Sequence, residues 1–251
     1  MPTPVAIITG GGTGVGRATA LSLARLGYSL LINYSRSQAE AEQTVADALA
    51  LGAKAILFRA DVADDAQCRS MVDAVVDAFG RIDVLVNCAA TTRFIDAANL
   101  DAVTDDDWHR IFDVNLLGPF HCIRAVKQPM LNSGGGQIVS VSSIAAVLGK
   151  GSSIPYAASK AALNNVTVAL ARELAPHIRV NAVAPGFITG RWLEQGLGAG
   201  YEAAKRFAEE RTPLQRVCVP EDVADAIVSL ITGSKMITGQ VLTCDGGMTL
   251  G

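Results

Sequence analysis

The first 25 residues place a glycine-rich turn between a buried strand and a helix, and this arrangement restricts the chain to few folds. The apolar run Val5–Ile8 predicts the strand, and Arg17–Arg25 has the pattern of an amphipathic helix. Between them, Gly10, Gly14 and Gly16 follow the spacing T-G-x-x-x-G-x-G. Such glycines allow a tight turn and a close approach of the backbone to a pyrophosphate. The flanking strand and helix favour a dinucleotide cradle over a merely flexible turn.

Strand-like and helix-like segments alternate along the rest of the chain. The predicted strands cover 5–8, 29–33, 55–59, 83–87, 137–142, 179–183 and 241–243, and the predicted helices cover about 13–26, 38–51, 64–80, 105–131, 156–177 and 221–232. No linker or repeat divides the chain, so we predict one α/β domain over residues 1–251. Its core is a doubly wound parallel sheet of about seven strands with helices on both faces, and ligands bind at the C-terminal strand ends.

Composition narrows the classes of function. Half of the 251 residues are apolar and 5% are aromatic, which suits parallel strands covered by helices. A net charge of −3 without a basic stripe argues against nucleic acid as a partner. No apolar run has the length of a membrane span, and the N-terminus leaves no room for a signal peptide, so we expect a cytoplasmic protein. Five scattered cysteines are expected to be reduced, and three unclustered histidines give no support for a metal site.

The residues after the second strand bear on the choice of cofactor. An acidic residue there would bind the adenosine ribose and repel a 2′-phosphate. The chain instead reads Asn33-Tyr34-Ser35-Arg36-Ser37, with no acid before Glu40. One cation and two hydroxyls suit a phosphate monoester, which favours NADP(H) over NAD(H). The alternative is a solvated Arg36, which would leave NAD possible.

Tyr156 and Lys160 form a candidate proton-transfer pair. Four residues apart on a helix, they lie on one face about one turn apart. A free phenol has a pKa of about 10, and a neighbouring ammonium lowers it toward the working range. Ser143, with Ser142 before it, lies just past a predicted strand. Asn115 lies within an apolar helical run, where it is either a functional group or a core amide with satisfied hydrogen bonds.

Taken together, these motifs resemble the short-chain dehydrogenase/reductase family over essentially the whole chain. The resemblance rests on the glycine turn 10–16, Asp61-Val62, 87–90, Asn115, Ser143, Tyr156 with Lys160, 181–186 and 245–247. Several details are similar to 3-oxoacyl-acyl-carrier-protein reductases, and 33–37 is similar to the cofactor loop of pteridine reductases. The resemblance implies a Rossmann-type fold and hydride transfer between NADP(H) and a carbonyl or secondary alcohol. It also implies a homotetramer.

The family's roles transfer to matching positions. Tyr156 is implied as the acid/base, Lys160 as the ligand of the nicotinamide ribose that lowers the tyrosine pKa, and Ser143 as the group that polarises the substrate oxygen. Asn115 is implied to kink its helix and to anchor a water of the proton relay. The implied cofactor-binding residues are Gly10, Thr13, Gly14, Val15, Gly16, Ser35, Arg36, Ser37, Asp61, Val62, Asn87, Ala89, Tyr156, Lys160, Pro185, Gly186, Ile188 and Thr189.

Ala90 and three segments depart from that pattern or leave the substrate open. Ala90 stands where the family has glycine, and 132–136 and 175–177 lack the basic residues expected for an acidic carrier protein. The glycine-rich loop 187–201 predicts a mobile lid. Its apolar side chains would either cover an apolar substrate or serve ordinary helix packing; they are Trp192, Leu193, Leu197 and Tyr201. Its Arg191 would either bind an anionic substrate or be a solvated residue. A pteridine reductase and a nucleotide-binding protein without turnover are the alternative functions.

Overall fold

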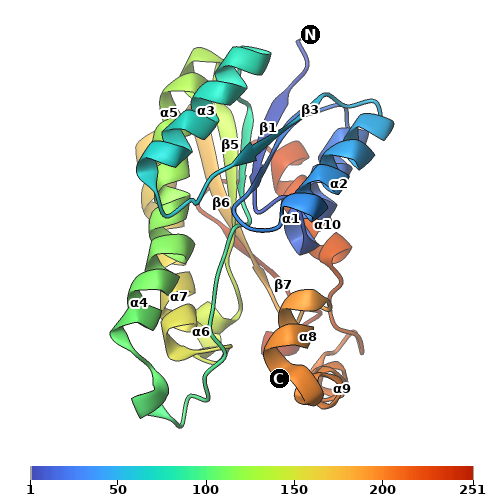
Figure 1. The fold of residues 1–251 in the computed structure, drawn as a ribbon, viewed down its shortest axis with the longest axis vertical. Coiled ribbons are helices and arrows are strands. Elements are labelled where there is room, and N and C mark those ends of the chain that lie inside the picture. Colours follow the sequence, from blue (N-terminus) through green and yellow to red (C-terminus); the bar gives the residue numbers. More distant parts are fainter. Residues whose placement is uncertain (1, 251) are drawn as a thin grey trace.

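The computed structural model describes residues 2–250, so Met1 and Gly251, the ends of the predicted domain, lie outside it. Seven strands form one parallel sheet in the order β3-β2-β1-β4-β5-β6-β7, which confirms the predicted doubly wound sheet (Figure 1). The strands are β1 (Val5–Thr9), β2 (Ser29–Tyr34), β3 (Ala55–Arg59), β4 (Val84–Asn87), β5 (Gly136–Val141), β6 (Ile178–Pro185) and β7 (Val241–Cys244). The chain order reverses between β1 and β4, where a crevice for a ligand opens in such sheets.

Helices cover both faces of the sheet. They are α1 (Gly14–Arg25), α2 (Gln38–Ala50), α3 (Asp65–Phe79), α4 (Asp105–Phe112), α5 (Gly118–Asn132), α6 (Ala145–Leu148), α7 (Ile154–Leu174), α8 (Arg191–Leu197), α9 (Tyr201–Arg211) and α10 (Pro220–Thr232). The buried residues of α3, α5 and α7 pack with Ile7 and Leu31 of the sheet, while those of α1, α2 and α10 pack with Ile8 and Leu30. The side chains of adjacent strand residues thus pack on opposite faces of the sheet, because side chains alternate between the two faces along a strand.

The predicted helix 105–131 is correct in extent but not continuous. It begins at α4, where Thr104 and Asp107 form a capping box: the Asp107 N–H donates to Thr104 Oγ1 at 3.2 Å, and the Thr104 N–H donates to Asp107 Oδ2 at 3.0 Å. A π-helical turn, Asp113–Leu117, separates α4 from α5. Such a turn holds an extra residue and often marks a functional position.

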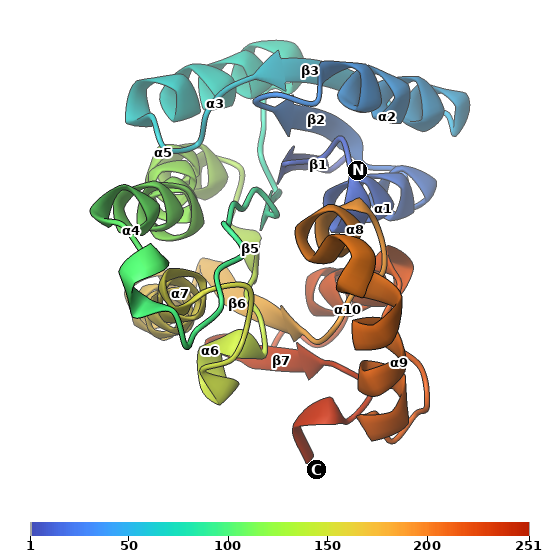
Figure 2. The same cartoon turned by 60° about the horizontal axis from the view of Figure 1, so that its bottom comes forward.

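The lid segment contains more regular structure than its glycines suggest. Residues 187–201 were expected to form a mobile loop, but α8 and a 3₁₀ turn at Gly198–Gly200 occupy most of it, and α9 follows. The glycines interrupt the apolar periodicity by which a helix is identified in a sequence. Figure 2 shows α8 and α9 beside the C-terminal strand ends. Within residues 2–250, no helix is long and apolar enough to cross a membrane, and all five cysteines are free.

Candidate active site

The glycine turn after β1 lies against the end of β4. Thr9 Oγ1 accepts hydrogen bonds from the N–H groups of Cys88 and Ala89, each at 3.1 Å. Gly10 has a φ of +62°, and a Cβ added to it would lie 3.0 Å from the Ala89 backbone. A Cβ on Gly16 would lie 2.3 Å from the Gly10 carbonyl oxygen. The turn therefore has the close backbone packing that the glycine spacing predicts, at the crevice between β1 and β4.

Asn33, which sequence reasoning considered only as a missing acid, holds the glycine turn in place. Its Oδ1 accepts from the Gly10 N–H at 3.2 Å, and its backbone oxygen accepts from the Gly11 N–H at 3.0 Å. Its Nδ2 donates to the Ala60 carbonyl oxygen at 3.0 Å. The side chain thus joins the ends of three strands. The available signal was a polar residue at the buried end of an apolar strand, because such a group requires partners.

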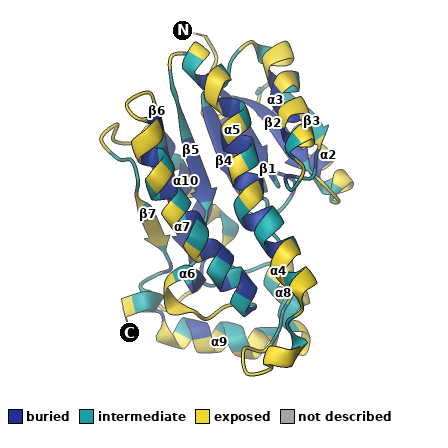
Figure 3. Ribbon diagram, turned by 90° about the vertical axis from the view of Figure 1, so that its left-hand side faces the viewer, coloured by how far each residue is buried: buried dark blue, intermediate teal, exposed yellow. Residues whose placement is uncertain are grey.

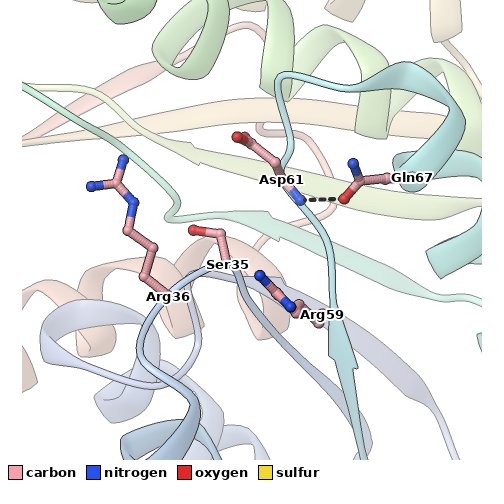
Figure 4. A pocket seen from close by; sticks show the side chains of 5 residues that line it. All are labelled: Ser35, Arg36, Arg59, Asp61 and Gln67. Carbon is pink, nitrogen blue, oxygen red and sulfur yellow. Dashed lines mark hydrogen bonds between the residues drawn. The ribbon is translucent and has the colours of Figure 1, made fainter.

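A polar pocket of about 460 Å³ lies beside the end of β2 (Figure 4). Its lining residues are Ser35, Arg36, Arg59, Asp61 and Gln67. In Figure 4 the Arg36 and Arg59 side chains extend on either side of Ser35. Sequence reasoning missed Arg59, which reaches this pocket because the last residue of β3 lies beside β2. Two cations close to a hydroxyl suit a phosphate group.

Asp61 and Val62, two of the implied cofactor-binding residues, lie at this pocket. The Asp61 Oδ1 accepts from the Ala63 N–H at 3.1 Å, and its Oδ2 forms an ion pair with Arg110 of α4 at 3.1 Å. Val62 is buried, and a Cβ added to Gly118 would lie 2.7 Å from its side chain. This packing fixes the turn after β3 against the start of α5.

Ser143, Tyr156 and Lys160 come together at the end of β5. The helix α7 begins at Ile154, two residues earlier than predicted. Ser153 caps it, because its side-chain oxygen accepts from the Tyr156 N–H at 3.4 Å. The Lys160 Nζ lies 5.7 Å from the centroid of the Tyr156 ring, and Ser143 is near enough to the Tyr156 hydroxyl to lower its pKa. The one-face geometry expected from the four-residue spacing is therefore present.

The electrostatics of the pair differ from the expected lowering of the tyrosine pKa. Burial raises the pKa of Tyr156, and the hydrogen bond with Ser143 acts in the opposite direction. Burial also lowers the pKa of Lys160 to about 8. The Lys160 Nζ donates to the Val141 carbonyl oxygen at 2.7 Å, so its contact is with a neutral dipole. Desolvation thus favours a neutral phenol, because the charged form of a buried group is disfavoured.

Ser142 and Ser143 have separate roles. The Ser142 hydroxyl donates to Asn164 Oδ1 at 2.5 Å, which fixes it between β5 and α7. The Ser143 Oγ accepts from the Ala145 N–H at 3.1 Å. Ser142 is therefore held by the helix α7, while Ser143 lies near enough to Tyr156 to lower the pKa of its hydroxyl.

Asn115 lies inside the π-helical turn and is fully buried. Its Oδ1 accepts from the Thr91 N–H at 2.8 Å, and its Nδ2 donates to the Thr91 carbonyl oxygen at 3.0 Å and to Ser159 Oγ at 3.1 Å. Ser159 in turn donates to the Tyr156 carbonyl oxygen at 2.7 Å. The amide has satisfied hydrogen bonds and joins the segment after β4 to the tyrosine helix. These bonds agree with the core-amide alternative, and the part of Asn115 in catalysis stays a prediction.

The segment 185–189 is held between two neighbouring stretches of chain. The Gly186 N–H donates to the Cys244 carbonyl oxygen at 3.0 Å, and the Thr189 N–H donates to the Cys218 carbonyl oxygen at 2.9 Å. A Cβ on Gly186 would lie 2.8 Å from Asp245 Cβ. The Asp245 carboxylate accepts two backbone N–H groups at 2.8 Å, so the Asp-Gly-Gly motif is a structural turn.

The residues at the crevice fit a dinucleotide. Asn87 is buried at the end of β4, and its Nδ2 donates to Ser140 Oγ at 3.2 Å. Its Oδ1 is buried without a hydrogen-bond partner among residues 2–250. An unpaired buried acceptor costs about 1–3 kcal/mol, so this atom is suited to a ligand's hydroxyl. The glycine turn at the start of α1 adds free N–H groups and a positive dipole end for phosphates.

Comparisons with known proteins agree with this arrangement. A family described as enoyl-(acyl carrier protein) reductase matches residues 10–249. A ketoacyl reductase assigned to the granaticin polyketide synthase of Streptomyces violaceoruber is 41% identical over 98% of this chain and 96% of its own length. The 3-oxoacyl-[acyl-carrier-protein] reductase of Synechocystis is 39% identical over 98% and 97%.

A solved structure from Burkholderia xenovorans, described as a short-chain dehydrogenase/reductase, has a TM-score of 0.93 at 39% identity. The alignment covers both chains completely. Fold, site geometry and relatives point to the same conclusion: this chain is an oxidoreductase that acts on carbonyl or secondary alcohol groups, and it belongs to the short-chain dehydrogenase/reductase family.

Proposed function

We propose that the protein is an NADPH-dependent reductase that converts a carbonyl group to a secondary alcohol. The observation that carries this proposal is the meeting of Ser143, Tyr156 and Lys160 at the end of β5, beside the glycine turn. The buried hydroxyl of Tyr156 keeps its proton at neutral pH, because its pKa is raised. A protonated donor suits reduction, in which the substrate oxygen must gain a proton.

Each catalytic group has its own role in the transfer of the hydride and the proton. When bound, reduced nicotinamide supplies a hydride to the carbonyl carbon. Ser143 donates a hydrogen bond to the carbonyl oxygen, and Tyr156 transfers its hydroxyl proton to that oxygen as negative charge develops there. The Lys160 ammonium stabilises the phenolate that remains. Asn115 and Ser159 position this machinery by joining Thr91 to the tyrosine helix.

Arg36 is proposed as the main ligand of the adenosine 2′-phosphate. It lines the same pocket as Ser35 and Arg59. Ser37 lies next to it in the chain, and the Arg191 Nη2 donates to Ser37 Oγ at 3.4 Å. Two cations and two hydroxyls favour NADP(H), since charge-assisted contacts to phosphate are stronger than neutral ones.

The substrate class that we propose is a 3-oxoacyl thioester. Two of the relatives are named for the reduction of ketoacyl groups, and they match this chain over nearly its full length. A pteridine reductase is the second candidate, supported by the resemblance of residues 33–37 to the cofactor loop of those enzymes. A nucleotide-binding protein without turnover is disfavoured, because such a protein would not need all four catalytic positions filled.

A substrate screen tests this proposal. The purified protein is mixed with NADPH and, in turn, acetoacetyl thioester, simple ketones, sugars and biopterin, and the loss of NADPH absorbance is followed. We expect turnover of the thioester and ketones. Turnover of biopterin alone would favour the pteridine alternative, and stoichiometric NADPH binding without turnover of any compound would contradict the reductase.

The pH profile should show the titration of Lys160. Its pKa is lowered to about 8, so the side chain is charged below that pH and loses its charge above it. We therefore expect kcat/KM for NADPH, which reports the free enzyme, to fall as pH rises through about 8. Lys160→Arg keeps the charge at every accessible pH and should remove this limb. A limb that persists unchanged in Lys160→Arg would assign it to another group.

We also expect a homotetramer with two-fold axes. Trp108, Leu117 and Phe120 are exposed in α4, in the π-helical turn and in α5, and these helices lie on one outer face of the molecule beside α7 (Figure 3). Exposed apolar residues grouped in this way mark an association surface. Light scattering at micromolar concentration should give about four times the chain mass of 26.1 kDa. A mass equal to one chain would contradict this expectation.

A further inference from the structure

The helix α8 touches two different walls of the crevice. It follows β6 in the chain, but its first residue, Arg191, forms an ion pair with Glu40 and a hydrogen bond with Ser37, which follow β2. Near its other end, Gly196 packs against Phe94, which follows β4. Helix α8 therefore crosses the C-terminal edge of the sheet as a lid, on the side seen in Figure 2.

The contact between Gly196 and Phe94 leaves no space for a side chain on the lid. A Cβ built on Gly196 would lie 2.0 Å from Phe94 Cε2 and 2.1 Å from Cζ. Gly196 is not among the glycines with positive φ, so its backbone conformation suits any residue. Glycine at this position therefore permits a close approach, and the edge of the phenylalanine ring lies directly on the lid backbone.

Phe94 is attached to the catalytic side of the crevice. The next residue, Ile95, donates its N–H to the Ser152 carbonyl oxygen at 2.8 Å, and the hydroxyls of Thr92 and Ser152 are 2.6 Å apart. Ser152 directly precedes the capping residue of the tyrosine helix. On the other side, Asn115 holds Thr91 through two hydrogen bonds. The chain on both sides of Phe94 is thus held against the catalytic segments, and the ring lies against the lid.

We propose that Phe94 is a specificity-determining residue that closes the lid against Gly196 and limits the length of the substrate. A carbonyl compound short enough to be enclosed leaves the contact intact. A long acyl chain that projects between the lid and the segment after β4 must separate the ring from Gly196. This inference rests on the proposed reductase function, so its test includes a measurement that needs no turnover.

Hydrogen exchange of the lid amides tests the contact without catalysis. Gly196→Ala places a Cβ in the ring, so exchange within residues 188–200 should accelerate about tenfold. Gly200→Ala is the matched control, because nothing lies within 4 Å of a Cβ there, and it should leave exchange unchanged. The double variant Phe94→Ala/Gly196→Ala has room for the added methyl group and should exchange like Phe94→Ala alone. Equal exchange in Gly196→Ala and Gly200→Ala would overturn the contact.

Paired thioester substrates test the effect on specificity. The N-acetylcysteamine thioesters of 3-oxobutanoate and 3-oxodecanoate differ only in chain length. Phe94→Ala should raise the ratio of kcat/KM, long over short, by about tenfold, as expected when an apolar pocket gains room for several methylenes. Phe207→Ala, which removes an exposed ring on α9, should leave the ratio unchanged. An unchanged ratio in Phe94→Ala would overturn the proposal. If the wild-type protein reduces neither thioester, that result would count against the proposed function. The hydrogen-exchange experiment would then still decide whether the lid contact is present.

Discussion

Tyr156→Phe should lower kcat for carbonyl reduction by about a hundredfold or more, because a positioned general acid contributes about 10²–10⁴. The substitution removes only the phenol hydroxyl, whose pKa is raised by burial. The Kd for NADPH should stay within about twofold of the wild-type value, since the lost group acts on the substrate oxygen rather than on the cofactor. Single-turnover kinetics and a cofactor titration measure the two effects separately.

A matched control is available on the far side of the molecule. Tyr28 precedes β2, at the end of the sheet away from the crevice, and it also has a raised pKa because of burial and the charge of Asp83. Tyr28→Phe removes an equivalent hydroxyl and should leave kcat unchanged. Retention of more than about a tenth of kcat in Tyr156→Phe, a barrier increase under about 1.4 kcal/mol, would remove Tyr156 from the role of proton donor.

Arg36→Ala should erase most of the preference for NADPH over NADH. A charge-assisted hydrogen bond to phosphate contributes about 1.5–3 kcal/mol, which corresponds to roughly ten- to a hundredfold in Kd. Arg36 is an exposed residue of its pocket, so added salt should screen its charge. The difference in Kd between NADPH and NADH should therefore become smaller. Titration of both cofactors at two salt concentrations measures the preference and its screening.

Arg59→Ala distinguishes the contributions of the two cations of this pocket to NADPH binding. Both guanidinium groups extend beside Ser35, so removal of Arg59 should weaken NADPH binding while leaving NADH binding nearly unchanged. The effect should be smaller than that of Arg36→Ala if Arg36 is the main ligand. Equal affinities of the unmodified protein for NADPH and NADH would show that neither arginine binds the adenosine 2′-phosphate. The assignment of NADP would then be dropped.

The parts of the fold that sequence predicts well are those fixed by neighbouring residues. The strand at Val5 and the glycine turn after it are specified within a dozen residues, and both are confirmed. Tyr156 and Lys160 share a helix face because of their spacing alone. The π-helical turn was expected only through the family's kink at Asn115, since the residues around it have ordinary helical periodicity.

What sequence could not supply depends on residues far apart in the chain. Gly196 and Phe94 are separated by about a hundred positions, and nothing local indicates that one requires the other. Arg59 reaches the polar pocket beside the end of β2 only through the pairing of β3 with β2. The direction of the Tyr156 pKa shift follows from burial, which the neighbouring lysine in the sequence does not reveal.

The π-helical turn makes the length of this helix inseparable from the site. Successive residues of a helix are rotated by about 100° around its axis, so deleting one residue within 113–117 would restore regular hydrogen bonds and turn α4 by that angle against α5. Arg110 would then leave Asp61, and Asn115 would leave Thr91. A deletion that makes the helix regular would therefore break two contacts, one with the segment after β3 and one with the segment after β4. Here chain length, and not side-chain identity alone, fixes the alignment of the helix with the segments after β3 and β4.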